Sequence, residues 1–544
     1  MRLTVRRFLD LCRPRALAGF SSWLRGNGWD MAMTNPDDPL HESRVPSDRV
    51  RLANDRDLRP EGAFVLYWMT AARRTHWNYG LERAAAWAHA LGRPLVVLEA
   101  LRVAYPYASD RLHAFVLRGM ADNTRRLAEA GVVHHAYVEP HPGAGKGLVA
   151  ALAGRACVVV TDDYPTFFLP RMIASAAKQI PVRFEQVDSN GLLPIHAPGR
   201  VFTTAFSFRA YLQKNLLPHL RRRPLPDPLA EGLPAPSKNL LPRDLLARWP
   251  LASPELLAAA PEALAALPID HAVPVVSRIP GGPEAARAAL ARFLRSNLLR
   301  YDTERNDPDA RATSGLSPYL HFGHISAHEI FAELERLENW TEKKTKPARG
   351  KREGFWGMSA PVESFLDELV TWREVGLNLC AHRPDDAKAF ESLPDWAQKT
   401  LADHESDPRP SLYSFAELEG ARTADPVWNA AQRELLRDGR IHNYLRMLWG
   451  KRVLEWTRTP REALAALIEL NDKYALDGRD PNSYSGILWT FGRYDRPWAP
   501  ERPVYGTVRY MSSSNTLKKI DLERYLVEFG GPGDEARPAK RHRK

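Results

Sequence analysis

The chain has 544 residues, 44% of them hydrophobic, and a formal net charge of +11. This length exceeds what a single core usually organises, so we expect two or more domains, and the positive charge favours an anionic partner, nucleic acid first. Three cysteines without a CxxC pair argue against a disulfide scaffold, a zinc site and a four-cysteine iron–sulfur cluster, so no metal is expected, and they fit a reducing cytoplasm.

The first part of the chain is predicted to be an α/β domain. Residues 1–45 form a basic extension, in which the first 26 residues carry six arginines against one aspartate. From 46 to 200, short apolar runs that are typical of buried parallel strands alternate with segments whose apolar residues recur at helical spacing. This alternation predicts a doubly wound parallel sheet. The three clearest strands are residues 63–69, 93–101 and 156–164.

The second part of the chain is predicted to be all-helical. Residues 201–283 are expected to be a connection with short helices, because fourteen prolines lie between Pro218 and Pro283. Strand signals nearly vanish over residues 284–530, and residues 531–544 form a basic tail. The first helix of this part begins at Pro283 and carries an apolar face. That face consists of Leu290, Phe293, Leu294 and Leu298.

Tryptophans and charged residues gather in the last third of the chain. Arg446, Trp449 and Trp456 recur at helical spacing and share one helix face, and Trp428 precedes them. Such a pattern is more often a core stripe than a functional array. The alternative is a relay for single electrons, because tryptophan is readily oxidised. The chain has no GxGxxG fingerprint, so a dinucleotide-binding Rossmann site is not indicated.

Two other segments carry polar groups at regular spacing. The hydroxyls of Thr313, Ser314 and Ser317 stand just before a proline, where they can cap a helix or bind a phosphate. Taken alone, the segment is an ordinary helix cap. Glu368 and Trp372 lie one helical turn apart and share a face, which is a common arrangement by itself.

Six motifs follow one another along the helical part: YDTERNDP from Tyr301, TSGLSPYLHFGHIS from Thr313, FLDELVTWRE from Phe365, DPVWNAAQ from Asp425, LNDKYALDGRDPNSYSGILW from Leu470 and RPVYGTVRYMS from Arg502. In this order they resemble the class II cyclobutane pyrimidine dimer photolyases. A fainter match covers VLYWM from Val65 and VDSNGLLPI from Val187. Together the matches span roughly Arg49 to Phe529. The resemblance implies an N-terminal α/β domain and an all-helical C-terminal domain that binds FAD.

The resemblance assigns roles around the flavin. Trp449 would be the tryptophan nearest the flavin, Trp428 its onward partner and Trp456 a nearby third member. Asn471 would face the flavin N5, and Arg446 and Asp477 would form a buried ion pair beside the ring. The residues that would hold FAD are Tyr301, Thr313, Ser314, Leu316, Ser317, Arg446, Asp477, Gly478 and Arg479.

The resemblance also implies a pocket for damaged DNA. Glu368 would hydrogen-bond the carbonyl side of the dimer, Trp372 and Trp489 would stack on the flipped lesion, and Met447 would complete the lining. The arginines expected to contact DNA phosphates, or the space left by the extruded bases, are Arg305, Arg496 and Arg509. The implied activity is light-driven repair of cyclobutane pyrimidine dimers by an electron from excited, reduced FAD, without net redox change.

The expected partner is therefore UV-damaged DNA. We expect a cytoplasmic monomer that reaches the nucleoid through DNA, with no membrane contact, because no apolar run is as long as a membrane helix. In the family the α/β domain can hold a second, light-harvesting chromophore, a deazaflavin or FMN, which this sequence leaves unassigned.

Two alternatives stay open at this point. A cryptochrome-like photoreceptor would keep the flavin and the tryptophans but lose the lesion pocket, and the intact Glu368, Trp372 and Trp489 argue against it. A light-independent flavin redox enzyme, or a DNA-binding module, is the other. The chain also departs from the family: it reads RYDRPW after Trp489, LWGKR around Trp449 and NLC around Leu379, and it carries an unusually basic insertion at residues 341–353.

Overall fold

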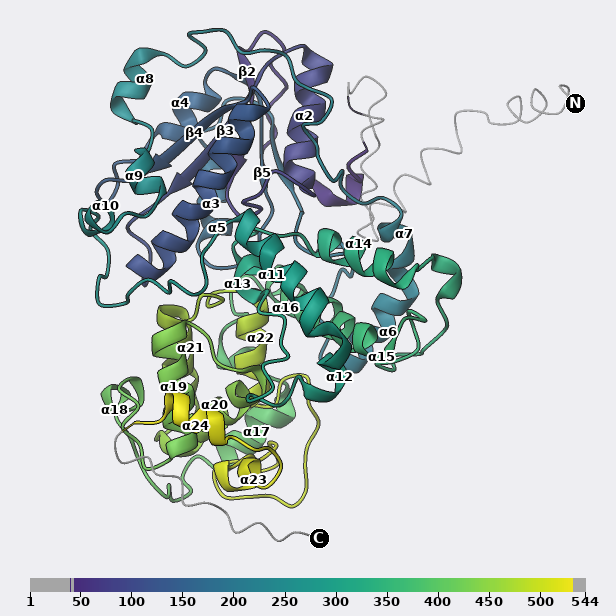
Figure 1. Ribbon diagram of the computed structural model, residues 1–544, viewed down its shortest axis with the longest axis vertical. Helices are drawn as coiled ribbons and strands as arrows, with labels where there is room; N and C mark the ends of the chain where they lie inside the picture. Colours follow the sequence, from purple (N-terminus) through teal and green to yellow (C-terminus); the bar gives the residue numbers. More distant parts are fainter. Residues whose placement is uncertain (1–39, 41–43, 532–544) are drawn as a thin grey trace, which may run out of the picture. The chain divides into compact units, whose positions relative to one another are not determined.

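A computed structural model describes residue 40 and residues 44–531. The predicted basic extension, apart from residues 40, 44 and 45, and the predicted basic tail, apart from residue 531, lie outside the described residues. Figure 1 shows the α/β part in purple and blue and the helical part in teal, green and yellow. Among the described residues, none of the helices combines the length and the apolar character needed to cross a membrane.

Six strands form one sheet in the order β1-β6-β5-β2-β3-β4. The pairs from β2 to β6 are parallel, and β1 joins β6 in the antiparallel sense at the edge. Because the chain winds outward from β2 in both directions, the predicted doubly wound sheet is confirmed, with one antiparallel strand added. The strands are β1 (Val50–Leu52), β2 (Phe64–Met69), β3 (Leu95–Leu101), β4 (Val133–Val138), β5 (Ala156–Asp162) and β6 (Phe184–Val187).

Helices cover both faces of the sheet, which explains why β2 and β5 are buried along their whole length. On one face, Phe64, Leu66 and Phe184 pack against α4, α5 and α8 (Arg243–Arg248). On the other, Glu185 of β6 accepts hydrogen bonds from two side chains of α2. The helices of this part are α2 (Tyr79–Leu91), α3 (Asp110–Glu129), α4 (Leu148–Ala153) and α5 (Leu169–Ala177).

The proline-rich connection contains short helices, as predicted, and much of it packs on the α/β part. Leu245 of α8 belongs to the core on one face of the sheet, and Leu257 of α9 and Leu264 of α10 pack with α3. The boundary at residue 283 stays a prediction. The helices are α6 (Ala205–Asn215), α7 (Leu217–Leu220), α8 (Arg243–Arg248), α9 (Pro254–Leu257) and α10 (Pro261–Ala265).

The described residues after 283 form helices and no named strand. Of the predicted apolar face of the first helix, Leu290, Phe293 and Leu294 lie in the helix and are buried or partly buried, whereas the helix ends at Ser296 and the buried Leu298 belongs to the 3-10 turn that follows. These helices are α11 (Pro283–Ser296), α12 (Tyr301–Glu304), α13 (Ser317–His321), α14 (Ala327–Glu338), α15 (Ala360–Leu366), the π-helical turn η4 (Asp367–Trp372), α16 (Arg373–His382), α17 (Asp395–Asp403), α18 (Phe415–Glu419), α19 (Pro426–Asp438), α20 (Asn443–Trp456), α21 (Pro460–Tyr474), α22 (Pro481–Thr490), α23 (Ser513–Leu517) and α24 (Glu523–Phe529). Single 3-10 turns are η1 (Ser47–Arg49), η2 (Leu298–Arg300), η3 (Glu342–Lys344) and η5 (Phe390–Ser392).

Local sequence signals fix where the functional helices begin. Asp425 caps α19, Thr459 caps α21 and Asp480 caps α22, in each case by accepting a backbone N–H with the side chain. A proline follows each cap at the first helical position, where its missing N–H costs nothing. The motifs DPVW and DPNS therefore mark the starts of helices.

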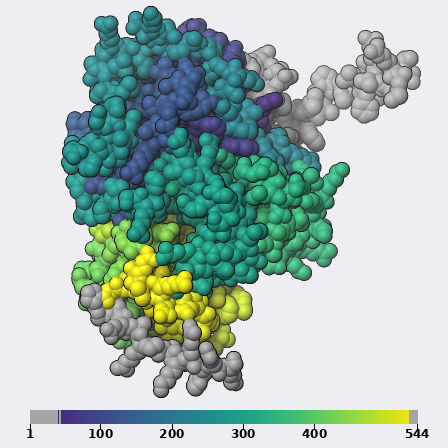
Figure 2. Space-filling model, viewed as in Figure 1, coloured from purple at the N-terminus to yellow at the C-terminus, as the bar shows by residue number. Residues whose placement is uncertain are grey.

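The C-terminal end of the described chain packs against the region around residue 309. Asp309 accepts the backbone N–H groups of Arg524 and Tyr525, and Figure 2 shows the yellow C-terminal residues against teal ones.

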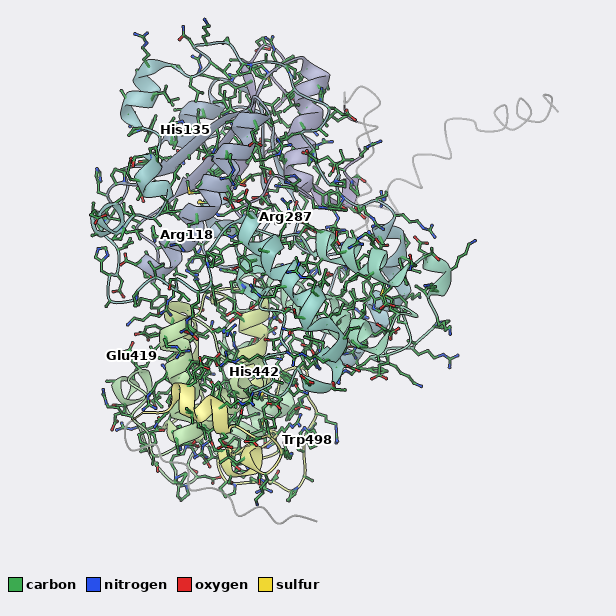
Figure 3. The ribbon with its side chains drawn as sticks, viewed as in Figure 1. Arg118, His135, Arg287, Glu419, His442 and Trp498 are labelled. Carbon is green, nitrogen blue, oxygen red and sulfur yellow. The ribbon has the colours of Figure 1, made fainter. Side chains whose placement is uncertain are left out.

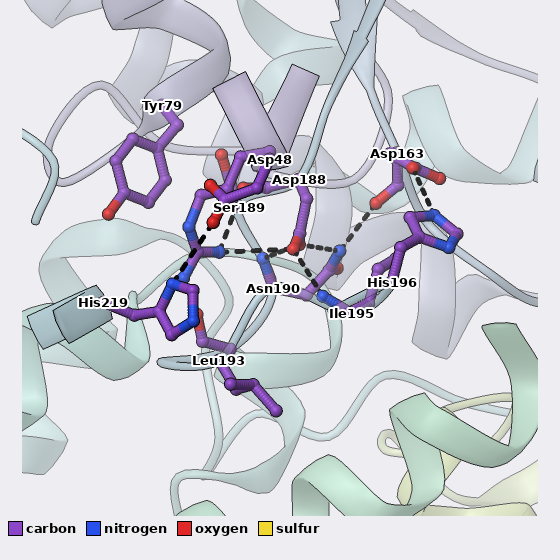
Figure 4. A network of polar contacts seen from close by, with 12 residues as sticks. Asp48, Tyr79, Asp163, Asp188, Ser189, Asn190, Leu193, Ile195, His196 and His219 are labelled. Carbon is purple, nitrogen blue, oxygen red and sulfur yellow. Dashed lines mark hydrogen bonds and ion pairs between the residues drawn. The ribbon is translucent and has the colours of Figure 1, made fainter. Parts of the chain in front are cut away.

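The VDSNGLLPI segment joins the sheet to the helical part. Glu374 of α16 accepts the backbone N–H groups of Leu192 and Leu193, at 2.7 and 3.1 Å. A side chain at Gly191 would stand 2.7 Å from the Glu374 carboxyl carbon, so only glycine allows this approach. Arg49 binds the other side of the segment, through the Asp188 carboxylate and the carbonyl of Leu192. Figure 4 shows Asp188 in the same network, where it also accepts the backbone N–H of Ile195.

Replacement of Glu374 by glutamine should change how stability depends on pH. Burial raises the Glu374 pKa to about 7, although the two backbone N–H groups oppose the shift. A carboxyl whose pKa is higher in the folded state contributes stability that is fully present below its unfolded pKa, about 4.5, and is lost as pH rises to about 7. The Tm advantage of the wild type over Glu374→Gln should therefore shrink between pH 4.5 and pH 7. Parallel Tm curves for the two proteins would contradict this.

Candidate functional site

Two neighbouring cavities lie in the helical part. The first has a volume of about 560 Å³ and the second about 420 Å³. Six residues from η4, α20 and α22 or next to them line both, so the cavities share a wall. These residues are Glu368, Trp372, Asn443, Arg446, Gly486 and Trp489. Of the residues labelled in Figure 3, His442 is among the lining residues of the second cavity and Trp498 among those of the first.

Close helix packing builds the shared wall. A side chain at Gly376 of α16 would stand 2.7 Å from the carbonyl oxygen of Pro481, so glycine lets α16 and α22 approach. Gly450 of α20 likewise faces Thr490 of α22, where an added Cβ would lie 2.6 Å from the threonine methyl group. This contact accounts for the glycine in LWGKR. On the wall itself, the rings of Trp372 and Trp489 stack with centroids 4.7 Å apart.

The first cavity brings together most residues predicted to bind the lesion. Arg305 and Glu368 form an ion pair there, with side chains 13% and 25% exposed. Arg305 was predicted to contact DNA phosphates or the space left by the extruded bases; it lines the first cavity beside the Tyr301 ring, and its contact with DNA stays a prediction. Burial and the Glu368 carboxylate raise the pKa of Tyr301 well above its ordinary value. The other predicted residues that line this cavity are Trp372, Arg446, Met447, Trp449, Asn471, Trp489 and Arg509.

Asn471 lines the first cavity with a side chain already engaged in hydrogen bonds. Its Nδ2 donates to Asp472, and its Oδ1 accepts the Ser483 hydroxyl at 3.0 Å. These bonds fix the orientation of the amide. Its predicted position against the flavin N5 stays a prediction, since this residue lines the first cavity and not the second.

The second cavity gathers most residues predicted to hold the cofactor. Tyr301, Thr313, Ser314, Leu316 and Ser317 line it. The ordinary-cap interpretation of this segment is wrong, because Leu316 occupies the N-cap position of α13 and no side chain caps the helix start. The hydroxyls are thus not used to begin the helix.

Charged and polar groups line the rest of the second cavity. Arg446 and Asp477 form the predicted ion pair at 2.8 Å, with side chains 23% and 13% exposed, so the pair is half-buried. Both ring nitrogens of His442 are buried without a hydrogen-bond partner. Burial and the nearby Arg440 lower the His442 pKa to about 4, so its imidazole is neutral near pH 7.

The three predicted relay tryptophans form one buried array, of which Trp449 lines the first cavity. Trp428 Nε1 donates to the backbone carbonyl of Trp449 at 3.0 Å, and the rings of Trp428 and Trp456 lie 5.5 Å apart in an edge-to-face arrangement. Trp449 Nε1 donates to the Gln432 side chain at 2.9 Å. All three tryptophans are at most 2% exposed.

Besides Trp428 and Trp456, three predicted site residues line neither cavity. Arg479 has a left-handed backbone and a guanidinium over the rings of Phe167 and Phe322, and neither it nor Gly478 lines the second cavity. Arg496 is exposed and lies over the Trp498 ring, outside the lining of the first cavity.

Sequence reasoning missed four residues near the cavities. Gln432 orients Trp449, His442 lines the second cavity, and Trp498 and Arg352 line the first. Gln432 is the last residue of the DPVWNAAQ motif, and its place in that motif was the signal that could have identified it. Arg352 was visible only as part of the basic insertion. Among the described residues, no group of histidines, cysteines and carboxylates could hold a metal ion.

Known proteins with similar sequences cover almost the whole chain. A deoxyribodipyrimidine photo-lyase of Methanothermobacter thermautotrophicus is 34% identical over 90% of this chain and 100% of its own length. A deoxyribodipyrimidine photo-lyase of rice, Oryza sativa, is 35% identical over 90% of this chain and 91% of its own, and one of Potorous tridactylus is 30% identical over 89% and 85%. The chain belongs to the deoxyribodipyrimidine photo-lyase family. This confirms the family resemblance and the enzyme class that it implies.

Solved structures confirm the fold. A bacterial class III photolyase from Agrobacterium tumefaciens matches with a TM-score of 0.63 at 18% identity, over 86% of each chain. A cryptochrome from Synechocystis matches with a TM-score of 0.61 at 17% identity, over 86% of this chain and 88% of that one. No family model matches the chain. The photolyase fold therefore positions the two cavities, and membership of a family of FAD-dependent DNA repair enzymes implies FAD and damaged DNA as ligands.

Proposed function

We propose that this protein repairs cyclobutane pyrimidine dimers in DNA under light, with FAD in the second cavity and the dimer in the first. The shared wall is the observation that carries this proposal. Glu368, Trp372 and Arg446 line both cavities, so one layer of side chains separates the two ligands. The stacked rings of Trp372 and Trp489 form part of that layer.

The residues of the second cavity fit a flavin dinucleotide. The hydroxyls of Thr313, Ser314 and Ser317 suit phosphate oxygens, and the Arg446–Asp477 pair offers a fixed charge distribution beside a ring that changes charge. The unpartnered His442 imidazole supports a polar ligand, because buried polar groups are normally hydrogen-bonded. When bound, FAD supplies a single electron after it absorbs light. Arg479 and Gly478 would affect flavin binding only indirectly, by fixing the turn that positions Asp477.

The first cavity suits a flat, uncharged lesion with carbonyl groups. Trp372, Met447 and Trp489 supply apolar surface, and the Arg305–Glu368 pair supplies the polar contacts. An ionised carboxylate only accepts hydrogen bonds, so Glu368 would accept a pyrimidine N–H. Arg305 would then donate to a pyrimidine carbonyl and stabilise the negative charge of the reduced dimer. The base must leave the helix to reach this cavity, which costs least at a damaged step.

Repair should be light-dependent and direct. UV-irradiated oligothymidine is incubated with flavin-loaded, chemically reduced protein under blue light, in parallel with a dark control. We expect the absorbance at 260 nm to return only in the light, because splitting restores the C5=C6 double bonds that the dimer lacks. Photoreduction of the flavin without restored thymines would contradict repair and favour a photoreceptor. An oligonucleotide with a (6-4) photoproduct is the control substrate and should stay unrepaired, because no histidine among the described residues lines the first cavity to transfer a proton.

A further inference from the structure

The insertion at residues 341–353 forms an exposed cationic segment between α14 and α15, which Figure 1 shows as the loop at the right. Its side chains include two carboxylates, and one of these, Glu342, pairs with Arg221. All six of its cations are exposed: Lys343, Lys344, Lys346, Arg349, Lys351 and Arg352. The segment, which we name the basic loop, is thus one of the densest local positive charges in the described residues.

The basic loop is held in place by its backbone. Gly350 N–H donates to the Gln213 side chain at 2.6 Å, and the same side chain donates to the Lys351 carbonyl at 2.8 Å. Arg209 donates to the Gly350 carbonyl. At its two ends, Trp340 and Trp356 are buried and joined by a hydrogen bond from the Trp340 indole to the Trp356 carbonyl. The charges therefore stand on a fixed frame, which lowers the entropy lost when they bind a ligand.

The basic loop reaches the first cavity through its last cation. Arg352 lines that cavity, and its guanidinium lies 3.3 Å from the Asp367 carboxylate. Asp367 is buried and is already held by two hydrogen bonds from Arg209. Its neighbour in η4, Glu368, faces the same cavity and pairs with Arg305. The loop thus borders the cavity that would receive the flipped dimer.

We propose that the basic loop binds the phosphates of the DNA strand that flanks the dimer; this inference rests on the proposed function for the location of the dimer. A nucleotide that enters the first cavity leaves its neighbouring phosphates at the cavity rim, where the loop stands. Double-stranded DNA carries about one negative charge per 1.7 Å of its axis, so closely spaced cations match it. Five cations of the loop contact phosphates irrespective of sequence or damage. Arg352, in the cavity wall, contributes to discrimination in favour of damaged DNA.

Binding of duplexes with and without one thymine dimer, measured in the dark at several salt concentrations, tests the proposal. The loop variant carries K343Q, K344Q, K346Q, R349Q and K351Q. A matched control variant carries R155Q, R171Q, K178Q, K238Q and R243Q, which removes five exposed cations from the α/β part and the connection. The log–log salt slope of the loop variant should fall by about 0.9 for each lost phosphate contact, and thus by about 4 to 5 when all five contacts are lost. The slope should fall equally for both duplexes, and the control should keep the wild-type slope.

An unchanged slope in the loop variant, or an equal loss in the control, would overturn the proposal, the second because net charge alone would then explain the effect. Arg352→Gln should reduce the preference for the damaged duplex with little change in slope, and an unaltered preference would remove Arg352 from recognition. These results do not depend on light. If the wild type bound DNA through the loop but never restored thymines, the repair function would fail and the loop inference would stand.

Discussion

Replacement of Trp449 by phenylalanine should slow light-driven reduction of the bound flavin to roughly a tenth of the wild-type rate or less, a change of about 1.4 kcal/mol or more in the barrier. Trp449 lines the first cavity close to the shared wall, and behind it Trp428 and Trp456 continue the buried array. Phenylalanine keeps the ring volume approximately but is far harder to oxidise. The measurement is the flavin absorption spectrum during blue illumination with an external reductant.

Two controls separate electron supply from structure. Trp356→Phe changes another buried tryptophan of the helical part, outside the array, and should leave photoreduction at the wild-type rate. Chemically reduced Trp449→Phe should still repair dimers, because the tryptophan supplies electrons to the flavin and does not act on the lesion. Photoreduction of Trp449→Phe at the wild-type rate would remove the array from this role.

The sequence predicted the α/β sheet because its central strands are continuous apolar runs. It missed β4 and β6, since His134, His135 and Gln186 interrupt their apolar patterns. Tertiary contacts stabilise these two strands. β4 pairs with β3 along its length, and the buried Glu185 carboxylate of β6 forms ion pairs with Arg83 and Arg183. β1 has three residues and depends on its pairing with β6. Short or polar strands become recognisable only when their partners are known.

Site residues that belong to the family motifs could be predicted from the sequence. The contact that a side chain makes could not be predicted where several partners lie within its reach. The family motifs contain most of the predicted residues that line the two cavities, and two of these motifs, DPVW and DPNS, are helix starts capped by an aspartate. The motif that contains Arg305 did not show that its side chain pairs with Glu368 in the first cavity, because a long arginine side chain can reach several partners. Similarly, Arg479 follows Asp477 by two residues, yet its left-handed backbone directs it away from the second cavity.

The Arg305–Glu368 pair yields a prediction that depends on this position in the first cavity. Its two charges are largely removed from water, so removal of one partner leaves the other costly to keep in the cavity. Glu368→Ala would leave an unpaired guanidinium beside Tyr301, and any loss of repair would combine two causes. Glu368→Gln is the better variant, because the amide keeps the shape and one acceptor while it removes the charge.

Glu368→Gln should lower the yield of dimer repair by about ten-fold, since a hydrogen bond to a charged group contributes about 1.5–3 kcal/mol. Flavin content should stay at the wild-type level, because Tyr301, Thr313 and the Arg446–Asp477 pair are untouched.

Arg305→Gln should lower the yield of dimer repair as well. Its salt slope of DNA binding should stay close to that of the wild type, since this arginine lies in the cavity wall and not against the phosphates. The measurements are thymines restored per absorbed photon, flavin per protein and the salt slope. Wild-type repair in both variants would show that the pair does not contact the dimer, and a reduced salt slope in Arg305→Gln would return that residue to the phosphate backbone.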